Sequence, residues 1–247
     1  MVRSSLARPW AMILVFAFVL AACGGGSAST APGTTAPTTA PPTSPPPTPV
    51  ATSSASPAAS LAETGRIDIP DQGFSITLAD GWTRIPMDPA TLDAFVKQLP
   101  PDSDMAKIMT GQAGQLAAAG IKLWAMDLRP DAIAAGFASN LNVIVQPGTG
   151  MDLQVLKAMA KGQLDNISSI SNTAMSDVTL PAGDAVKATY DLHQALTNGS
   201  TIDVAGTQYY VAGPTNLYIL SFSCGGSQVT ACQSDTETMI KSLTLTP

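Results

Sequence analysis

The chain has 247 residues, a formal net charge of −6 and 45% hydrophobic residues, a composition that suits a folded domain. The excess of acidic over basic side chains argues against nucleic acid, or an anionic membrane surface, as the main partner. With three cysteines and one histidine, the chain offers few ligands for a metal site. We expect no cofactor and no bound metal.

The first apolar run has the features of an export signal. Two arginines precede a nearly continuous apolar segment, Ala11 to Ala22, which is shorter than the roughly 20 residues of a membrane-spanning helix. The run ends in Leu20-Ala21-Ala22-Cys23, which resembles a bacterial lipobox. On this interpretation residues 1–22 are a signal peptide, and Cys23 becomes the palmitate-bearing first residue of a lipoprotein. The alternative is an ordinary secretory signal with an accidental cysteine.

Residues 23–62 are expected to form the lipidated N-terminus and a disordered tether. From Ser27 to about Ser60 the chain is almost entirely Ala, Ser, Thr, Gly and Pro, without charge. Such a segment cannot bury enough apolar surface to fold, and its prolines favour an extended form that reaches on the order of 100 Å. The tether would hold the domain of residues 63–247 outside the cell membrane, on its extracytoplasmic face.

Two cysteines remain in the domain, Cys224 and Cys232. In an exported protein such a pair is expected to form a disulfide, which would stabilise the fold by roughly 2–3 kcal/mol. A metal pair is the alternative, although no second cluster of cysteines or histidines exists and His193 is the only histidine.

The beginning of the domain predicts one strand and two helices. The segment Gly73 to Leu78 alternates apolar and polar residues, as a half-buried strand does. Asp88 and Pro89 suit the start of a helix, which apolar residues at helical spacing continue to Leu99. A second helix is expected from Asp102 to Ala119.

The rest of the domain predicts strands between two further helices. The helices are expected over Met151–Asp165 and from Thr230 to Ile240, the second opening on a capping box of Thr230 and Gln233. The expected strands are Ile121–Leu128, Leu141–Val145, Ser171–Leu180, Ala185–Leu192, Thr201–Val211, Leu217–Ser223 and the edge strand Leu243–Leu245. Hairpins of this kind with helices between them indicate an α+β domain, an antiparallel sheet with helices packed on it.

Several short motifs resemble those of the PsbP-like proteins, which include small exported lipoproteins of the LpqN type. The motifs are Phe74-Ser75-Ile76 followed by Gly81-Trp82, Leu180 to Ala185, Tyr209-Tyr210-Val211, and Tyr218 to Phe222. The resemblance implies an α/β/α sandwich with a central antiparallel sheet over roughly Ile67 to Leu245. It also implies binding of partners or ligands rather than catalysis. The metal-binding histidines of photosynthetic members have no counterpart in this sequence, so the resemblance assigns no binding residue.

The function is inferred from three features of the sequence. They are the predicted anchor, the tether, and a domain in which no set of catalytic residues is recognised. We expect a non-enzymatic module that binds a hydrophobic small molecule or an envelope protein. One alternative is an envelope hydrolase that uses carboxylates such as Asp127, Asp177 or Asp191. Another is a purely structural envelope component. His193 has no Gly-x-Ser-x-Gly partner motif and is expected to be a strand-end residue.

Overall fold

A computed structural model describes residues 63–97, 118–134, 137–148, 151–195 and 201–246. Cys23, the tether and most of the helix expected over Asp102–Ala119 lie outside the described residues. No helix of the described part is long and apolar enough to cross a membrane.

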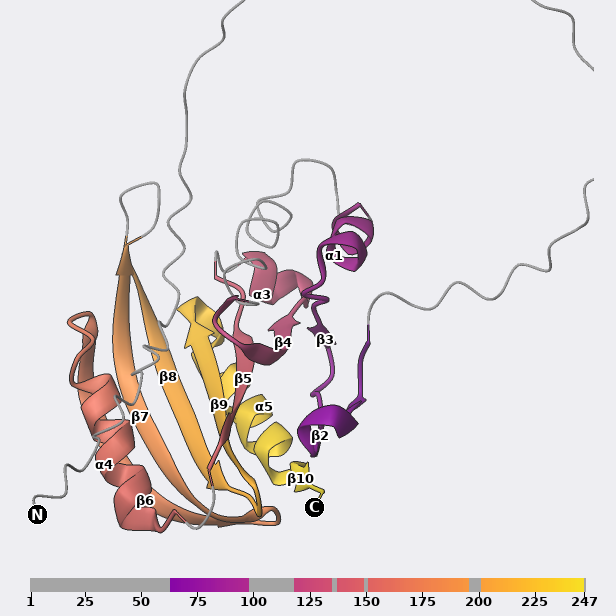
Figure 1. The fold of residues 1–247 in the computed structure, drawn as a ribbon. Helices are drawn as coiled ribbons and strands as arrows, with labels where there is room; N and C mark the ends of the chain where they lie inside the picture. Colours follow the sequence, from indigo (N-terminus) through magenta and orange to yellow (C-terminus); the bar gives the residue numbers. More distant parts are fainter. Residues whose placement is uncertain (1–62, 98–117, 135–136, 149–150, 196–200, 247) are drawn as a thin grey trace, which may run out of the picture.

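Seven strands form one antiparallel sheet, in the order β3-β4-β5-β9-β8-β7-β6 (Figure 1). The strands are β3 (Trp82–Arg84), β4 (Ile121–Asp127), β5 (Asn140–Pro147), β6 (Ile170–Leu180), β7 (Gly183–Ala195), β8 (Thr201–Ala212) and β9 (Asn216–Gly225). Every neighbouring pair runs antiparallel. The structure thereby confirms the α+β class predicted from the sequence.

The expected strands appear close to their expected bounds, and their successive side chains contribute to two different cores. On β8, for example, Tyr209 and Val211 belong to one core and Tyr210 to the other, since successive side chains of a strand point to opposite faces of the sheet. Short turns join β6 to β7 and β8 to β9. In the second turn the Gly213 amide donates to the Asn216 carbonyl at 2.8 Å.

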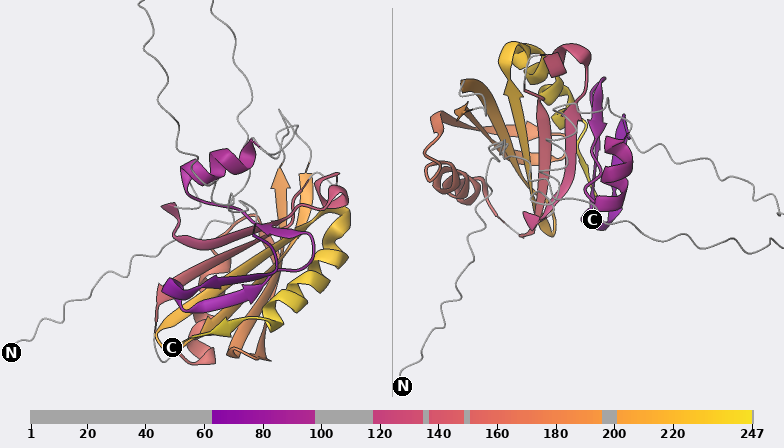
Figure 2. Two further views of the ribbon diagram at one scale, coloured as in Figure 1. Left: turned by 90° about the vertical axis from the view of Figure 1, so that its right-hand side faces the viewer. Right: turned by 90° about the horizontal axis from the view of Figure 1, so that it is seen from above.

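A second, three-stranded sheet joins the two ends of the domain. Strand β2 (Phe74–Thr77) lies between β1 (Arg66–Ile69) and the C-terminal β10 (Thr244–Leu245), and both pairs are antiparallel. Figure 2 shows the N-terminal strands, in indigo, close to the C-terminal end of the chain. The expected edge strand near residue 244 is therefore present, but it pairs with β2 instead of the main sheet.

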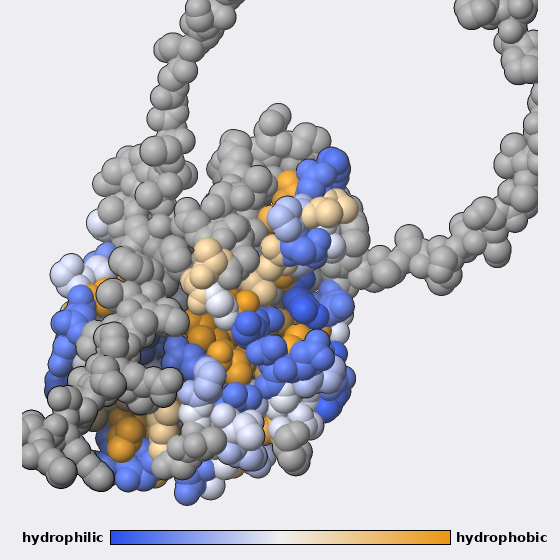
Figure 3. All heavy atoms as spheres, viewed as in Figure 1, coloured by the Kyte–Doolittle hydropathy of each residue, from blue (hydrophilic) through white to orange (hydrophobic). Residues whose placement is uncertain are grey.

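Helices cover both faces of the main sheet. Helix α4 (Leu153–Leu164) buries Leu156, Ala160 and Leu164 in one core, together with residues of α1 (Pro89–Val96). Helix α5 (Val229–Lys241) lies on the opposite face and buries Cys232, Met239 and Ile240 in a second core. This second core also takes up Phe74 and Ile76 of the small sheet. Figure 3 shows mainly hydrophilic residues around a hydrophobic area near the middle of the face in view.

The N-terminal cap predicted for α1 is present, whereas the one predicted for α5 is not. Asp88 caps α1 as expected, since its side chain accepts from the Thr91 amide at 2.8 Å. The capping box predicted at Thr230 is wrong. The short 3-10 helix η2 (Gly226–Gln228) leads directly into α5, so α5 begins at Val229 and its N-cap Gln228 makes no side-chain cap.

Apart from the 3-10 helices η1 (Pro70–Gln72) and η2, three short elements of the described residues were not predicted. They are β1, β3 and the five-residue helix α3 (Pro130–Ala134). Elements of three to five residues are too short to display a periodic pattern, so their sequences look like loops.

Candidate ligand pocket beside helix α5

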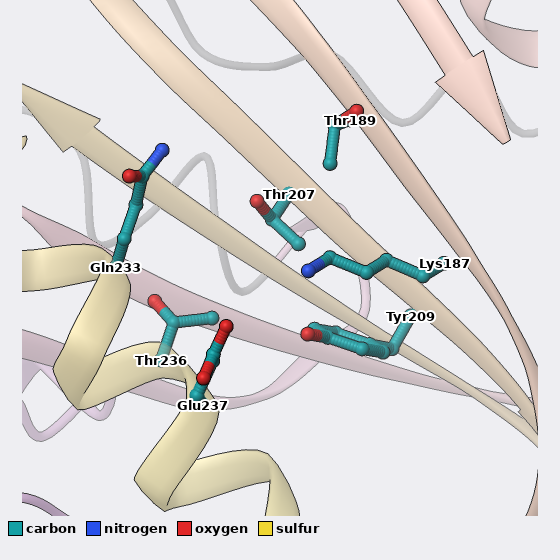
Figure 4. A pocket seen from close by; sticks show the side chains of 7 residues that line it. All are labelled: Lys187, Thr189, Thr207, Tyr209, Gln233, Thr236 and Glu237. Atoms are coloured by element: carbon teal, nitrogen blue, oxygen red, sulfur yellow. The ribbon is translucent and has the colours of Figure 1, made fainter. Parts of the chain in front are cut away.

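A small cavity of about 180 Å³ lies where helix α5 meets strands β7 and β8. Its walls are Lys187 and Thr189 of β7, Thr207 and Tyr209 of β8, and Gln233, Thr236 and Glu237 of α5 (Figure 4). All seven lining residues carry a polar group, so this pocket suits a polar occupant.

Strand pairing places the four residues of the sheet side by side. In the β7–β8 register Lys187 lies opposite Tyr209, and Thr189 lies opposite Thr207. Residues directly opposite each other share a face, as do residues two apart on one strand. The four side chains therefore form one polar square on the face that α5 partly covers.

Helical spacing places the three residues of α5. Gln233, Thr236 and Glu237 stand at positions i, i+3 and i+4, which lie on the same side of a helix. Thr236 is 3% exposed. Its Oγ1 donates a hydrogen bond to the Cys232 carbonyl at 2.9 Å, within the same helix. Gln233 and Glu237 are exposed, and they form the outer wall of the pocket.

The disulfide holds α5 against the sheet next to this pocket. Cys224 on β9 is bonded to Cys232 on α5, as the sequence predicts, with 5.6 Å between their Cα atoms. Cys232 directly precedes Gln233 and lies one turn before Thr236. The covalent link therefore fixes the part of α5 that forms the pocket wall.

The polar groups of the pocket lack protein partners. Thr236 apart, none of the lining side chains makes a hydrogen bond or an ion pair with any described residue. Tyr209 is 3% exposed and Thr207 is 8% exposed, and their hydroxyls border the cavity without a protein partner among the described residues. These hydroxyls are therefore free to bond to water, or to a ligand that enters the cavity.

Charge in the pocket is divided between its two walls. The Lys187 Nζ lies 5.7 Å from the centroid of the Tyr209 ring, a cation–π contact. Glu237 stands on the α5 side, and the ammonium, the Tyr209 hydroxyl and the carboxylate face the same space (Figure 4). Burial, and then the negative charge of Glu237, raise the pKa of Tyr209 to about 12. Tyr209 therefore keeps its proton near neutral pH and can donate a hydrogen bond.

The carboxylates considered for a hydrolase do not meet in the structure. Asp177 faces α4 and accepts from Lys157 Nζ at 2.8 Å. Asp191 follows Tyr190, a residue of the core on the α4 side, and therefore points to the opposite face. Asp127 lies on β4, with β5, β9 and β8 between it and β7. The structure therefore does not bring any two of these three together in one cleft.

Asp127 takes part instead in a structural ion cluster. It is fully buried, and it accepts from the Arg129 Nε at 2.9 Å. Arg129 also donates to Asp235 of α5 at 2.7 Å, and the Trp82 indole donates to the same Asp235 oxygen at 3.0 Å. The hydrogen bond to Asp127 is the main cause that raises the pKa of Arg129. The cluster ties β3 and the end of β4 to α5.

The remaining candidates have ordinary structural surroundings. His193 is exposed, and its Nδ1 lies 2.7 Å from Asp203 Oδ1, as a strand-end histidine would. In the described ranges, no three His, Cys, Asp or Glu side chains are close enough to hold a metal ion.

The pocket residues were not singled out from the sequence, although a weak signal exists. Lys187 and Thr189 put two polar side chains on one face of a strand whose other face is apolar. That alternation indicates a polar face on the strand. It does not indicate that helix α5, which begins at Val229, packs over this face.

Comparison with known proteins finds structural resemblance. No protein-family model and no curated protein matches the chain. Solved structures match, and one of them is LpqN of Mycobacterium tuberculosis, described as involved in cell envelope biogenesis. It shares 14% identity with the chain, over 75% of this chain and 92% of LpqN, with a TM-score of 0.45.

Two other solved structures match at similar levels. Cyanobacterial PsbP of Synechocystis shares 12% identity over 78% of this chain and 98% of its own, with a TM-score of 0.42. The Ran-binding protein Mog1p of Saccharomyces cerevisiae shares 10% identity over 74% of this chain and 96% of its own, with a TM-score of 0.41. The chain is thus similar to both the LpqN-type and the PsbP-type structures that its motifs resemble.

Proposed function

We propose that this chain is a non-enzymatic binding module, anchored to the outer side of the cell membrane, that takes a small polar ligand into the pocket beside α5. The observation that carries the proposal is the Tyr209 hydroxyl. It belongs to a side chain that is 3% exposed, it faces the cavity, and it has no partner among the described residues.

The other lining groups support a polar ligand over the hydrophobic one expected from the sequence. Three threonines, a tyrosine, a glutamine, a lysine and a glutamate present donors and acceptors around one small space. Pockets for hydrophobic ligands are usually lined by apolar walls with a few polar groups, and this pocket has polar groups on all sides. An apolar ligand would leave those polar groups unsatisfied.

A binding role fits the pocket better than hydrolysis does. A glycoside hydrolase, for example, typically needs two carboxyl groups that flank the scissile bond. Among the described residues that line this pocket, Glu237 supplies the only carboxylate. Asp127, the most buried of the acidic candidates, is paired with Arg129.

Placement at the envelope is supported by the sequence. The lipobox-like segment ending at Cys23 provides a lipid anchor, and two acyl chains hold a protein on a membrane stably where one does not. The tether that follows would let the domain search a volume of about 100 Å in radius around the anchor. A tethered binding domain meets its ligand near the surface, where the effective concentration is high.

The test is a binding screen with a variant that blocks the pocket. The Cys23→Ser chain, which is expected to be soluble, would be screened by NMR against amino acids, monosaccharides and short peptides. We expect at least one ligand to shift the amide signals of Thr207 and Gln233. In Thr189→Trp the indole would fill the cavity and lower the affinity about tenfold or more.

Thr173→Trp is the matched control, because Thr173 is an exposed residue of β6 that does not line the pocket. It should bind like the parent chain. Equal affinity in the parent chain, Thr189→Trp and Thr173→Trp would contradict the proposal, and so would the absence of any binding. A lipid that copurifies with the native chain and survives Thr189→Trp would favour a hydrophobic site elsewhere.

A further inference from the structure

We infer that the ligand of this pocket is a zwitterion of about the size of an amino acid, which presents a carboxylate to Lys187 and an ammonium group to Glu237. The inference rests on the proposed function and names the chemical class of its ligand.

The first argument is the pair of opposite charges without counter-ions. No ion pair joins Lys187 or Glu237 to any other side chain of the described residues, and the two do not pair with each other. Both are half-buried or exposed while the pocket is empty, so water solvates them. A ligand that fills the cavity removes part of this water, and charges that lose water are stabilised when they are paired.

A ligand with one charge would leave one of these residues uncompensated. An anion would satisfy Lys187 and repel Glu237, and a cation would do the reverse. An uncharged molecule would satisfy neither. A zwitterion meets both requirements at once, and the charge on each wall then sets its orientation.

The second argument is the arrangement of the neutral donors and acceptors. Lys187, Thr189 and Thr207 lie on the two paired strands, so the ammonium and two hydroxyls can donate to a carboxylate. Across the cavity, Glu237 lies beside Tyr209 and one helical turn from Gln233. An ammonium group with three donors fits the carboxylate and the amide oxygen of α5, together with the Tyr209 phenol oxygen on β8.

The third argument is size. The cavity of about 180 Å³ is below the roughly 300–1,000 Å³ of pockets that hold drug-sized ligands. It suits a single amino acid, or the end of a short peptide whose remainder extends into solvent past the exposed residues of α5.

The experiment compares three molecules that differ only in charge. Alanine carries both groups, alaninamide lacks the carboxylate, and lactate lacks the ammonium. Their affinities for the Cys23→Ser chain would be measured by NMR titration. We expect alanine to bind about tenfold more tightly than either analogue.

Two substitutions assign each charge to its wall. Lys187→Met should abolish the preference for alanine over alaninamide. The preference for alanine over lactate should remain. Glu237→Gln should abolish the preference for alanine over lactate and keep the preference for alanine over alaninamide. Lys241→Met is the control for Lys187→Met, because it makes the same change in net charge at an exposed position of α5 outside the pocket. It should change neither of the two affinity ratios.

The outcomes separate this inference from the proposed function. Equal binding of the three probes, or preference ratios unchanged by both pocket substitutions, would overturn the zwitterion. Binding of a monosaccharide that Thr189→Trp prevents, with no binding of alanine, would also overturn it while the binding function stands. If no molecule of the full screen binds in the pocket, both fail.

Discussion

At the scale of single residues, Tyr209 and Tyr210 are neighbours in sequence with opposite roles. The Tyr210 hydroxyl is buried on the α4 side, within hydrogen-bond distance of the Oε1 atoms of Gln163 (2.9 Å) and Gln208 (2.7 Å). The Tyr209 hydroxyl faces the pocket and has no such partner in the described chain. One hydroxyl stabilises the fold, and the other is available to a ligand.

Replacement of each tyrosine by phenylalanine should therefore give opposite results. Tyr210→Phe removes a buried hydroxyl whose one proton can go to Gln163 or to Gln208, and it should lower the free energy of unfolding by about 1–3 kcal/mol. Tyr209→Phe removes an unpaired hydroxyl and should leave stability nearly unchanged, while ligand affinity falls. Urea unfolding, together with the binding screen, measures both effects. A larger loss of stability in Tyr209→Phe would show that its hydroxyl has a structural role.

Arg129 also acts at this scale, since it compensates a fully buried carboxylate. Arg129→Met leaves Asp127 charged and without its main partner, which should destabilise the domain by roughly 3–5 kcal/mol. The double variant Asp127→Asn/Arg129→Met removes the charge as well and should recover much of that loss. Thermal unfolding of the two variants checks this, and equal destabilisation would contradict the account.

Gly81 explains why the arginine can lie where it does. Gly81 has a φ of +83°, and a Cβ at this position would overlap the Cγ of Arg129. The glycine next to Trp82 thus serves the turn and also makes room for the arginine. The sequence motif Gly-Trp has a local physical reason in this chain.

At the scale of elements, helix α5 is held by a covalent link and by the ion cluster. The disulfide between Cys224 and Cys232 fixes one turn of α5 to β9, and Asp235 connects the next turn to Arg129 and Trp82. Both attachments lie within four residues of Gln233. The pocket wall is therefore preorganised, which reduces the entropy lost on binding.

Removal of the disulfide should consequently affect stability and binding together. The variant Cys224→Ala/Cys232→Ala should lose roughly 2–3 kcal/mol of stability in the chain-entropy model, and ligand affinity should fall because Gln233 and Glu237 become less ordered. Chemical denaturation and the NMR titration measure the two quantities. Unchanged affinity would show that the ion cluster alone positions α5.

The long strands could be predicted from the sequence, whereas the pocket could not. The expected strand Thr201–Val211 differs from the observed β8 by one residue, because its alternation between two cores is visible in the sequence. The pocket depends on which residues of β7 and β8 lie opposite each other and on where α5 crosses them. Register and helix placement are set by packing between distant segments, and local patterns do not contain that information.

At the scale of the whole molecule, the sequence predicts a lipid anchor and a tether before the domain, for which we propose a binding role. The predicted anchor depends on one residue, Cys23. Cys23→Ser should release the protein into the medium, because a chain without its acyl groups loses about 0.8 kcal/mol of membrane affinity per buried methylene. Fractionation of cells followed by immunoblotting measures the distribution. Cys224→Ala/Cys232→Ala, which keeps Cys23, should remain with the membrane, and retention of Cys23→Ser would contradict the anchor.

The pairing of β10 with β2 has a consequence for how the chain reaches its final form. Ser75 of β2 bonds Thr244 of β10 across 169 residues of sequence, so the small sheet stays incomplete until Thr244 has been synthesised. Closing so large a loop is slow compared with local hairpin formation. For the export that residues 1–22 predict, a nascent chain that cannot finish folding early would remain competent for translocation, and the small sheet would form only after Thr244 has crossed the membrane.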